Sequence, residues 1–312
     1  MTTIIEILNV VVPVFLVIAL GYFLGSREFI PKAANNVISR IVFYVAAPSL
    51  LFRSAATATV SEVLDLETWG WAALVSVVMA FAVYVMAARS GPPRRGVIAQ
   101  GVQRSNMVFV GLPVIFNAFG DDVLGPAAVF IGLMVPVYNF LAVILLLLPH
   151  QGGQSRVDMW KKTAKGIVTN PLIIGSVGGI IFSALSIPLP LFADRTLEAV
   201  GRIAMPLALL SVGADLDFGR LRSDLFTASV VSAMKLLAYP ALVYAGLKFL
   251  GKEGMMLQFP VLVLASPTAV VSAVMAREMK GDEQLAGAIV IGTTIYSLFT
   301  ISAWLAFLKF FG

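Results

Sequence analysis

The chain has 312 residues, of which 59% are hydrophobic and 12% are charged, about half the charged fraction of an ordinary soluble domain. This composition excludes a soluble globular or disordered protein, and the lack of cysteine excludes disulfides, thiol catalysis and cysteine-bound metals. The formal net charge of +5 does not indicate nucleic-acid binding, because the basic residues are scattered among short loops and do not gather on one face.

Apolar runs long enough to cross about 30 Å of hydrocarbon recur along the whole chain. The first run, residues 4–24, has no Lys or Arg before Arg27, so it lacks the basic segment of a signal peptide and predicts a membrane span. The other spans are predicted near residues 36–56, 69–88, 96–118, 123–148, 167–187, 192–213, 226–247, 255–275 and 285–308. Because these runs are too long and too uniformly apolar for barrel strands, we expect an all-α integral membrane protein with ten transmembrane helices.

The loops between the predicted spans differ in positive charge. Loops that join an odd span to the next even span hold 13 Lys and Arg residues, and the opposite side holds four. The positive-inside rule therefore places the odd-to-even loops in the cytoplasm and both termini outside. We expect a multi-pass protein of the cell inner (plasma) membrane in this orientation.

The longest loop, residues 149–166, separates two halves that resemble each other. Prolines, glycines and a glutamine match at a spacing of 158 residues or close to it: Pro13 with Pro171, Gly21 with Gly179, Pro48 with Pro206, Gly96 with Gly254, Gln100 with Gln258, Pro113 with Pro267 and Gly132 with Gly292. Five spans per half is an odd number, so the second half enters the membrane from the opposite side. The sequence thus predicts an inverted repeat, with residues 1–148 as the first five-helix repeat, 149–166 as a cytoplasmic linker and 167–312 as the second repeat. Such repeats are typical of secondary transporters and also occur in some channels.

Spans four and nine carry prolines at equivalent places in the two halves. Pro113, two residues after Gly111, predicts an interruption of the helix at about residues 107–113, and Pro267 predicts one in span nine. Non-helical backbone at this depth is tolerated where it is buried in protein or lines a wet cavity, and the exposed ends of half-helices suit an anion. The alternative is a simple proline kink, which is enough to explain Pro13, Pro48, Pro136, Pro171 and Pro206.

Span four also holds the polar run Gln103-Arg104-Ser105-Asn106 within an otherwise apolar helix. An arginine at this depth is costly unless it faces the protein interior or water, and its guanidinium suits a carboxylate. Arg104 has two open readings of equal weight: a substrate contact, or a structural group that caps carbonyls freed by the break. Asn106 borders the break and is favoured as a site residue, because its amide can donate to a carboxylate oxygen.

Other polar residues of the spans are weaker candidates. Tyr138 and Asn139 follow Pro136 in span five, and Ser266 and Thr268 flank Pro267. Hydroxyls and amides also hold membrane helices together, so packing is the alternative role for each. Four basic residues are read as structural groups that lie towards span ends or extend to the membrane surface: Arg40, Arg53, Arg202 and Lys235.

No motif for nucleotide binding, metal ligation or a catalytic nucleophile is present in the sequence. The lone histidine, His150, is read as a solvated loop residue. We therefore expect no enzyme activity, no catalytic residue, no metal site and no cofactor. Without a nucleotide site, transport would be passive or driven by a gradient.

The stretch Arg104-Ser-Asn-Met-Val-Phe-Val-Gly-Leu-Pro113 and the Asn-Ala-Phe-Gly-Asp-Asp turn after it resemble the fourth span of the auxin efflux carrier family. The resemblance extends over the whole chain through the Pro48 span, the Pro206-Leu-Ala-Leu-Leu-Ser-Val-Gly213 span and Pro267. It implies ten spans, a fold similar to that of bile-acid/sodium symporters, and broken helices four and nine that cross at their prolines. It further implies a scaffold domain of spans one, two, six and seven, a transporter domain of spans three to five and eight to ten, elevator-like alternating access, and a homodimer through the scaffold.

The resemblance also implies that Asn106 contacts the substrate. The sequence predicts a carrier of small organic anions, such as malonate, malate or an auxin-like carboxylate, within the lipid bilayer and without nucleic acid as a partner. Alternatives are a sodium-coupled symporter of larger amphipathic acids, a channel, and a membrane sensor that does not transport. The predicted substrate-binding residues are Asn106, Arg104, Ser105, Gly111, Pro113, Tyr138, Asn139, Ser266, Pro267 and Thr268.

Overall fold

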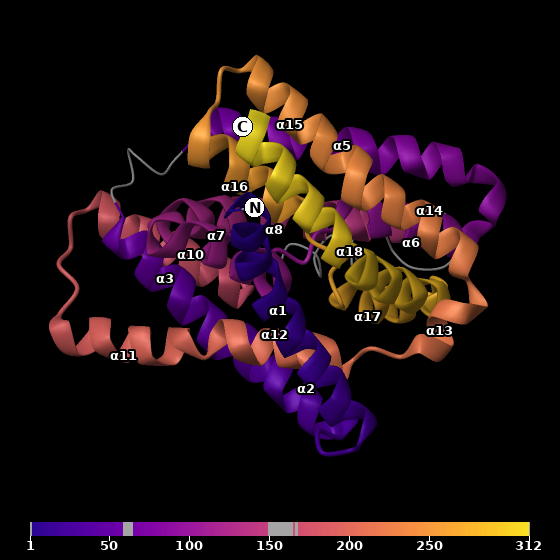
Figure 1. Cartoon of the computed structure of the whole chain (residues 1–312), viewed down its shortest axis with the longest axis horizontal. Coiled ribbons are helices and arrows are strands. Elements are labelled where there is room, and N and C mark those ends of the chain that lie inside the picture. Colours follow the sequence, from indigo (N-terminus) through magenta and orange to yellow (C-terminus); the bar gives the residue numbers. More distant parts are fainter. Residues whose placement is uncertain (1, 59–64, 149–164, 166–167, 312) are drawn as a thin grey trace. The chain divides into compact units, whose positions relative to one another are not determined.

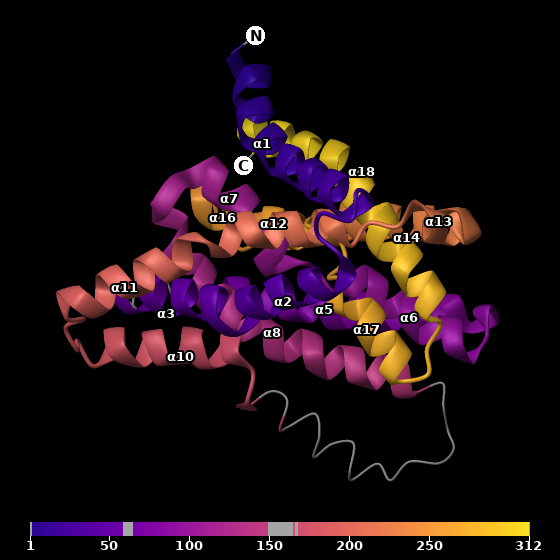
Figure 2. The ribbon, with the colours of Figure 1, turned by 90° about the horizontal axis from the view of Figure 1, so that it is seen from below.

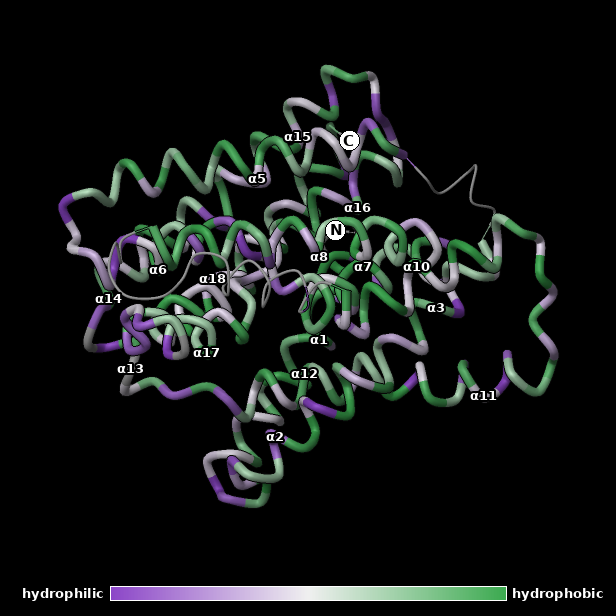
Figure 3. The backbone as a smooth tube through the Cα atoms, turned by 180° about the vertical axis from the view of Figure 1, so that it is seen from behind, coloured by the Kyte–Doolittle hydropathy of each residue, from purple (hydrophilic) through white to green (hydrophobic). Residues whose placement is uncertain are grey.

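The computed structural model describes residues 2–58, 65–148, 165 and 168–311. Of the described residues, 86% are helical, and none lies in a β-strand. Hydrophobic residues dominate the helices, and hydrophilic ones gather mainly at helix ends and connections (Figure 3). The prediction of an all-α protein is therefore confirmed. His150 and all of the predicted linker 149–166 except Lys165 lie outside the described residues.

Within the described ranges, seven helical segments have the length and hydropathy needed to cross a membrane. They are Ile5–Ser26, Lys32–Thr57, Leu66–Ser90, Met107–Leu147, Leu191–Ala214, Leu225–Phe249 and Glu283–Phe311. Shorter apolar helices cover Pro171–Ala184 and Gly254–Leu264. Several membrane-spanning helices are thus present, and the number ten stays a prediction.

The chain divides into two compact units. Unit 1 comprises Met1–Trp69, Val108–Pro136 and Gly166–Leu216, and unit 2 comprises Gly70–Met107, Val137–Lys165 and Asp217–Gly312. The helices up to the end of α8 (Figure 1) are α1 (Thr2–Ser26), α2 (Lys32–Ile41), η1 (Val42–Ala46), α3 (Ala47–Thr57), α5 (Leu66–Met86), η2 (Ala87–Ser90), α6 (Pro92–Gln103), η3 (Met107–Gly111), α7 (Leu112–Phe119), η4 (Gly120–Val123) and α8 (Leu124–Leu147).

The second part of the chain begins with three helices of unit 1 and continues in unit 2. Its helices are α10 (Pro171–Ala184), α11 (Leu191–Arg202), α12 (Ala204–Ala214), α13 (Phe218–Ser223), α14 (Leu225–Ala233), η5 (Met234–Ala238), α15 (Tyr239–Phe249), α16 (Gly254–Leu264), α17 (Val271–Glu278) and α18 (Glu283–Phe311).

Close helix packing in unit 1 depends on glycines. Helix α1 packs on α12, and α10 packs on α3, as Figure 2 shows for the second pair. A methyl group added at Gly21 of α1 would collide with the carbonyl oxygen of Leu210 on α12. One added at Gly179 of α10 would collide with the carbonyl oxygen of Phe52 on α3. Small residues at these crossings let two backbones approach closely, as is typical of membrane helices.

We expect Gly21→Ala and Gly179→Ala each to destabilise the protein by about 1–3 kcal/mol, because backbone atoms must move to admit the methyl group. Thermal unfolding of the purified variants measures this. The matched control is Gly70→Ala on α5, where an added methyl group meets nothing within 4 Å. A control midpoint equal to the parent's, with lowered midpoints for the other two, is expected. Unchanged midpoints for Gly21→Ala and Gly179→Ala would contradict the packing.

Each of three π-helical turns ends two residues before a proline. They are η1 before Pro48, η3 before Pro113 and η5 before Pro240. Proline has no N–H and its ring clashes with the carbonyl four residues back, and a widened turn accommodates both defects. For Pro240 that carbonyl is Leu236 O, which accepts a hydrogen bond from Trp304 Nε1 at 2.8 Å.

This corrects the predicted position of the break in span four. The helix was expected to be interrupted at about 107–113, but η3 and α7 are helical through Pro113. The interruption lies just before them, at Arg104–Asn106. In span nine, α16 ends at Leu264 and α17 begins at Val271, so Pro267 lies in non-helical backbone.

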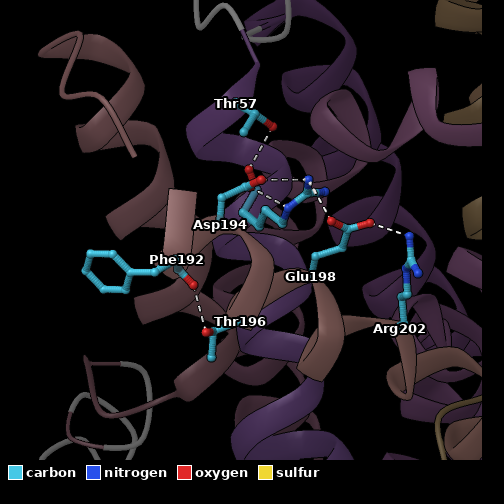
Figure 4. Close-up of polar contacts among 7 residues, drawn as sticks. Thr57, Phe192, Asp194, Thr196, Glu198 and Arg202 are labelled. Atoms are coloured by element: carbon cyan, nitrogen blue, oxygen red, sulfur yellow. Dashed lines mark hydrogen bonds and ion pairs between the residues drawn. The ribbon is translucent and has the colours of Figure 1, made fainter. Parts of the chain in front are cut away.

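Two of the arginines read as structural take part in ion pairs of unit 1. Arg53 of α3 donates from Nε to Asp194 Oδ1 at 2.6 Å and from Nη2 to Asp194 Oδ2 at 3.2 Å. Glu198, one turn further along α11, lies 3.5 Å from Arg53 Nη2 and also pairs with Arg202 (Figure 4). These contacts tie α3 to α11 and give both arginines a carboxylate partner.

Candidate functional site

Two interrupted helices of unit 2 meet at their non-helical residues. Residues 104–106 follow α6, and residues 265–270 connect α16 to α17. Ser105 and Thr268 form an isolated antiparallel bridge. Beside it, the Asn106 N–H donates to Pro267 O at 2.7 Å and the Ala269 N–H donates to Arg104 O at 3.1 Å. The two breaks thus satisfy each other's backbone groups, as buried non-helical backbone in a membrane protein requires.

Side chains of the second break satisfy the helix ends around it. Thr268 Oγ1 donates to Gly101 O, a carbonyl in the last turn of α6, at 2.6 Å. The Thr268 N–H donates to Thr293 Oγ1 on α18 at 3.0 Å. Ser266 Oγ donates to Val263 O at 2.6 Å. Ser266 and Thr268 therefore make capping contacts, which fit the packing role that the sequence offered as the alternative to substrate binding.

Ser105 lies at the centre of a buried chain of hydroxyl groups. Its Oγ donates to Leu264 O, the last carbonyl of α16, at 2.9 Å and accepts from Tyr138 Oη at 3.2 Å. Tyr138 Oη lies 2.9 Å from Tyr239 Oη, which lies 2.6 Å from Ser76 Oγ on α5. The chain connects the break to α8, α15 and α5.

Lys235 joins this chain, which corrects its reading as a residue near a span end. Its side chain is 0% exposed, so its amine does not extend to the surface. Lys235 Nζ donates to Leu264 O at 2.8 Å and to Ser105 Oγ, and it lies 4.5 Å from the centroid of the Tyr239 ring. The amine thus sits at the carboxyl end of α16, where the helix dipole favours positive charge.

Arg104 extends to the other side of the bridge. It is 8% exposed; Nη2 donates to Asn139 Oδ1 on α8 at 2.8 Å, and Nη1 points to Met275 Sδ on α17 at 3.0 Å. Arg104 has extended backbone, in which successive side chains point to opposite faces, so Arg104 and Ser105 lead away from each other. A thioether is a weak acceptor, so one guanidinium N–H is poorly satisfied.

Neither Arg104 nor Lys235 has a carboxylate partner among the residues that the structure describes. This contrasts with Arg53 and Arg202, which do. An ionised group taken out of water without a counter-ion is costly, so such groups are usually paired. No group of three or more His, Asp or Glu that could hold a metal occurs in the described ranges. The two buried basic side chains thus lie on opposite sides of the bridge.

Eight of the ten predicted site residues belong to unit 2. Arg104, Ser105, Asn106, Ser266, Pro267 and Thr268 meet at the two breaks, and Tyr138 and Asn139 reach them from α8 by hydrogen bonds to Ser105 and Arg104. The other two, Gly111 and Pro113, belong to unit 1, where Gly111 closes η3 and Pro113 lies in the first turn of α7.

Three buried polar residues close to the two breaks, Lys235, Gln100 and Gln103, were not among the predicted site residues. Gln100 and Gln103 are 0% exposed and lie in the last turn of α6, four residues and one residue before Arg104. Two amides and a guanidinium in one turn of an apolar span form a detectable signal. Lys235 offered a similar signal, because it lies ten residues into its predicted span, far from either end.

Comparisons with known proteins agree with a membrane carrier. A family model described as membrane transport protein matches residues 6–305. An uncharacterized transporter of Methanothermobacter thermautotrophicus is 28% identical over 302 residues, which cover 94% of this chain and 96% of that protein. A protein of Rhizobium meliloti named "Putative malonate transporter" is 23% identical, with 97% and 96% covered.

A third relative, an uncharacterized transporter of Methanocaldococcus jannaschii, is 21% identical, with 95% of this chain and 97% of that protein covered. The family and these relatives are membrane transporters and not enzymes. The resemblance to auxin efflux carriers that the span-four motif predicts is confirmed. The chain therefore belongs to the membrane transport protein family, a family of auxin-efflux-carrier-like membrane transporters.

Proposed function

We propose that the protein is a secondary transporter of small organic anions, namely short carboxylates such as malonate or malate, which bind at the bridge between the two interrupted helices. The observation that carries the proposal is the buried Arg104, whose guanidinium has no carboxylate partner among the described residues. A carboxylate substrate supplies the missing negative charge. It also offers two oxygens to a group built for bidentate binding.

Several fixed donors near the bridge support an anion rather than a neutral ligand. A carboxylate that leaves water must have its hydration replaced by hydrogen bonds. Arg104 and Lys235 provide charge, and we assign the Asn106 side chain as a further donor because it is buried at the break. Broken helices whose ends and freed backbone bind the substrate are the general plan of secondary transporters. The relative named for malonate is consistent with this substrate class.

Contacts in unit 1 support the proposed inverted repeat. Adding 158 to Gly21 gives Gly179, and subtracting 158 from Leu210 gives Phe52. The contact of Gly21 with the Leu210 carbonyl thus has a counterpart in that of Gly179 with the Phe52 carbonyl. The 41-residue segment Met107–Leu147 also supports ten spans. At about 1.5 Å per residue it is long enough for two crossings, and Gly120, with φ of +72°, lies between α7 and α8.

We further propose elevator-type alternating access with a scaffold and a transporter domain. Helices of the predicted spans one, two, six and seven all lie in unit 1, and those of spans three, eight, nine and ten lie almost entirely in unit 2. Spans four and five contribute to both units. This division supports a transporter domain that moves and carries the bridge with it. We also propose that the protein forms a homodimer through the scaffold domain in the cell inner membrane.

A thermal-shift screen of the purified protein against a panel of carboxylates tests the proposed function. Because a ligand that binds the native state raises its apparent stability, malonate or malate should raise the unfolding temperature in a concentration-dependent way. Sulfate and chloride at equal ionic strength are the controls. If no short carboxylate shifts the midpoint, the site assignment fails. A response that requires sodium and larger amphipathic acids would instead favour the symporter.

We expect the odd-to-even loops to face the cytoplasm, as the positive-charge asymmetry predicts. The chain has no cysteine, so single cysteines report position without background. Arg89→Cys, at the end of η2, should react with an impermeant maleimide only in permeabilised cells. Glu253→Cys, between α15 and α16, should react in intact cells. The reverse pattern would overturn the orientation.

A further inference from the structure

Four buried polar atoms near Arg104 have no hydrogen-bond partner among the residues that the structure describes. They are Gln100 Oε1, Gln103 Oε1, Gln103 Nε2 and Ser272 Oγ. Both glutamine side chains are 0% exposed and Ser272 is 3% exposed. Buried polar groups in native proteins are nearly always hydrogen-bonded, so several unsatisfied ones in one region require an explanation. Apolar side chains of the same size would be more favourable here if the atoms served packing alone.

A shared contact places Gln100 beside the Arg104 guanidinium, and helix periodicity brings Ser272 and Gln103 to the same region. Gln100 Nε2 lies 3.8 Å from Met275 Sδ, the same sulfur that Arg104 Nη1 contacts at 3.0 Å. Ser272 precedes Met275 by three residues on α17, so the two share a helix face. Gln103 follows Gly96 by seven residues, so the two lie on the same face of α6. Gly96 faces α8, the helix whose Asn139 accepts a hydrogen bond from Arg104.

We infer that Gln100, Gln103 and Ser272 form a polar subsite beside Arg104 that binds the second polar group of the substrate, a second carboxylate or a hydroxyl. The inference rests on the proposed function and names its substrate class: short dicarboxylates and hydroxycarboxylates, not monocarboxylates with an apolar or aromatic body. Gln103 is the specificity-determining residue, because both of its amide atoms are unpartnered.

The chemistry of these groups explains the selectivity. An amide supplies N–H donors and a carbonyl acceptor, and a serine hydroxyl supplies both in one atom, so together they can bind a carboxylate or a hydroxyl. A substrate with an apolar tail would leave all of these atoms unsatisfied. A site built to hydrogen-bond a polar group rejects the analogue that lacks it more strongly than an apolar pocket rejects a size change.

Binding of malonate and of propionate, which have the same number of carbons, tests the inference. Dissociation constants come from the concentration dependence of the unfolding temperature of the purified full chain. The parent should bind malonate at least about tenfold more tightly than propionate. In Gln103→Met, a change that keeps the side-chain length, this ratio should fall to about two, while propionate binds as it does to the parent.

The matched control is Thr300→Val on α18, which removes another buried, unpartnered polar atom and should keep the parent's ratio. If Gln103→Met does not yield folded protein, Gln100→Met provides the same measurement. A ratio near one in the parent, or an unchanged ratio in both glutamine variants, would overturn the inference while leaving carboxylate transport intact. If neither acid shifts the parent, the proposed function itself fails.

Discussion

Replacing Arg104 by methionine is expected to weaken malonate binding at least about hundredfold, which corresponds to about 2.7 kcal/mol. Truncating one member of a buried charge pair typically has an effect of this size, because the other charge is left without a partner. The unliganded variant should be as stable as the parent or more stable. Arg104 is buried with one amide and one thioether as side-chain partners, so its removal relieves desolvation without breaking an ion pair.

The measurement is thermal unfolding with and without malonate, and the control is Arg53→Met. Arg53 has two hydrogen bonds to Asp194, so its loss should lower the midpoint of the unliganded protein and leave the malonate response intact. The two variants are thus expected to separate binding from stability. If Arg104→Met unfolds at much lower temperature and binds malonate normally once folded, Arg104 is a structural cap, the other role that the sequence left open.

Replacing Lys235 by methionine is expected to abolish transport and to weaken malonate binding about tenfold or more. Its amine is buried against Ser105 and the Leu264 carbonyl without a carboxylate among the described residues. Methionine fills a similar volume, and Ser105 keeps its bond to Leu264 O. We therefore expect no loss of stability, because the cost of a buried, unpaired charge disappears with the lysine.

Uptake of labelled malonate into proteoliposomes and thermal unfolding give the two readings for Lys235. The matched control is Lys248→Met on α15, whose amine is partly exposed and lies 3.7 Å from Glu253. This control should transport like the parent. Transport by Lys235→Met at the parent's rate would show that the site holds a single functional cation.

The helices and the presence of a charged residue deep within a span, Arg104, could be predicted because both signals are local. A run of about 20 apolar residues predicts a span without knowledge of its neighbours. A charged residue inside such a run stands out for the same reason. The motif that continues to Pro113 also predicted the family, since it carries the resemblance on its own.

The position of the first break could not be predicted from proline alone. The rule that proline interrupts a helix assumes a regular α-helix, and the π-helical turn η3 accommodates Pro113. The helix stops instead at Arg104–Asn106, where its backbone groups find partners at Pro267 and Ala269. Those partners are more than 150 residues away in sequence, so no local pattern contains them.

Lys235 was misread for a similar reason. A lysine can extend its amine several ångströms along a helix, so its depth in a span does not fix where its charge lies. Here the amine is held by Ser105, in the non-helical stretch after α6, and by Leu264, at the end of α16. Gln103 shows the converse case, because its amide has no hydrogen-bond partner within the described residues, and this becomes visible only when the neighbours are placed.

Counterflow of malonate in proteoliposomes is the most direct test of whether the protein is a carrier that binds short carboxylates at the Arg104 bridge. Vesicles with purified protein are loaded with unlabelled malonate and diluted into labelled malonate at low concentration. We expect transient accumulation of label that saturates with concentration in parent vesicles, and no accumulation with Arg104→Met. A channel allows equilibration without accumulation, and a sensor allows neither. Two results would contradict a carrier with its site at Arg104. One is label in parent vesicles that never exceeds the label in protein-free vesicles, and the other is equal accumulation by parent and variant.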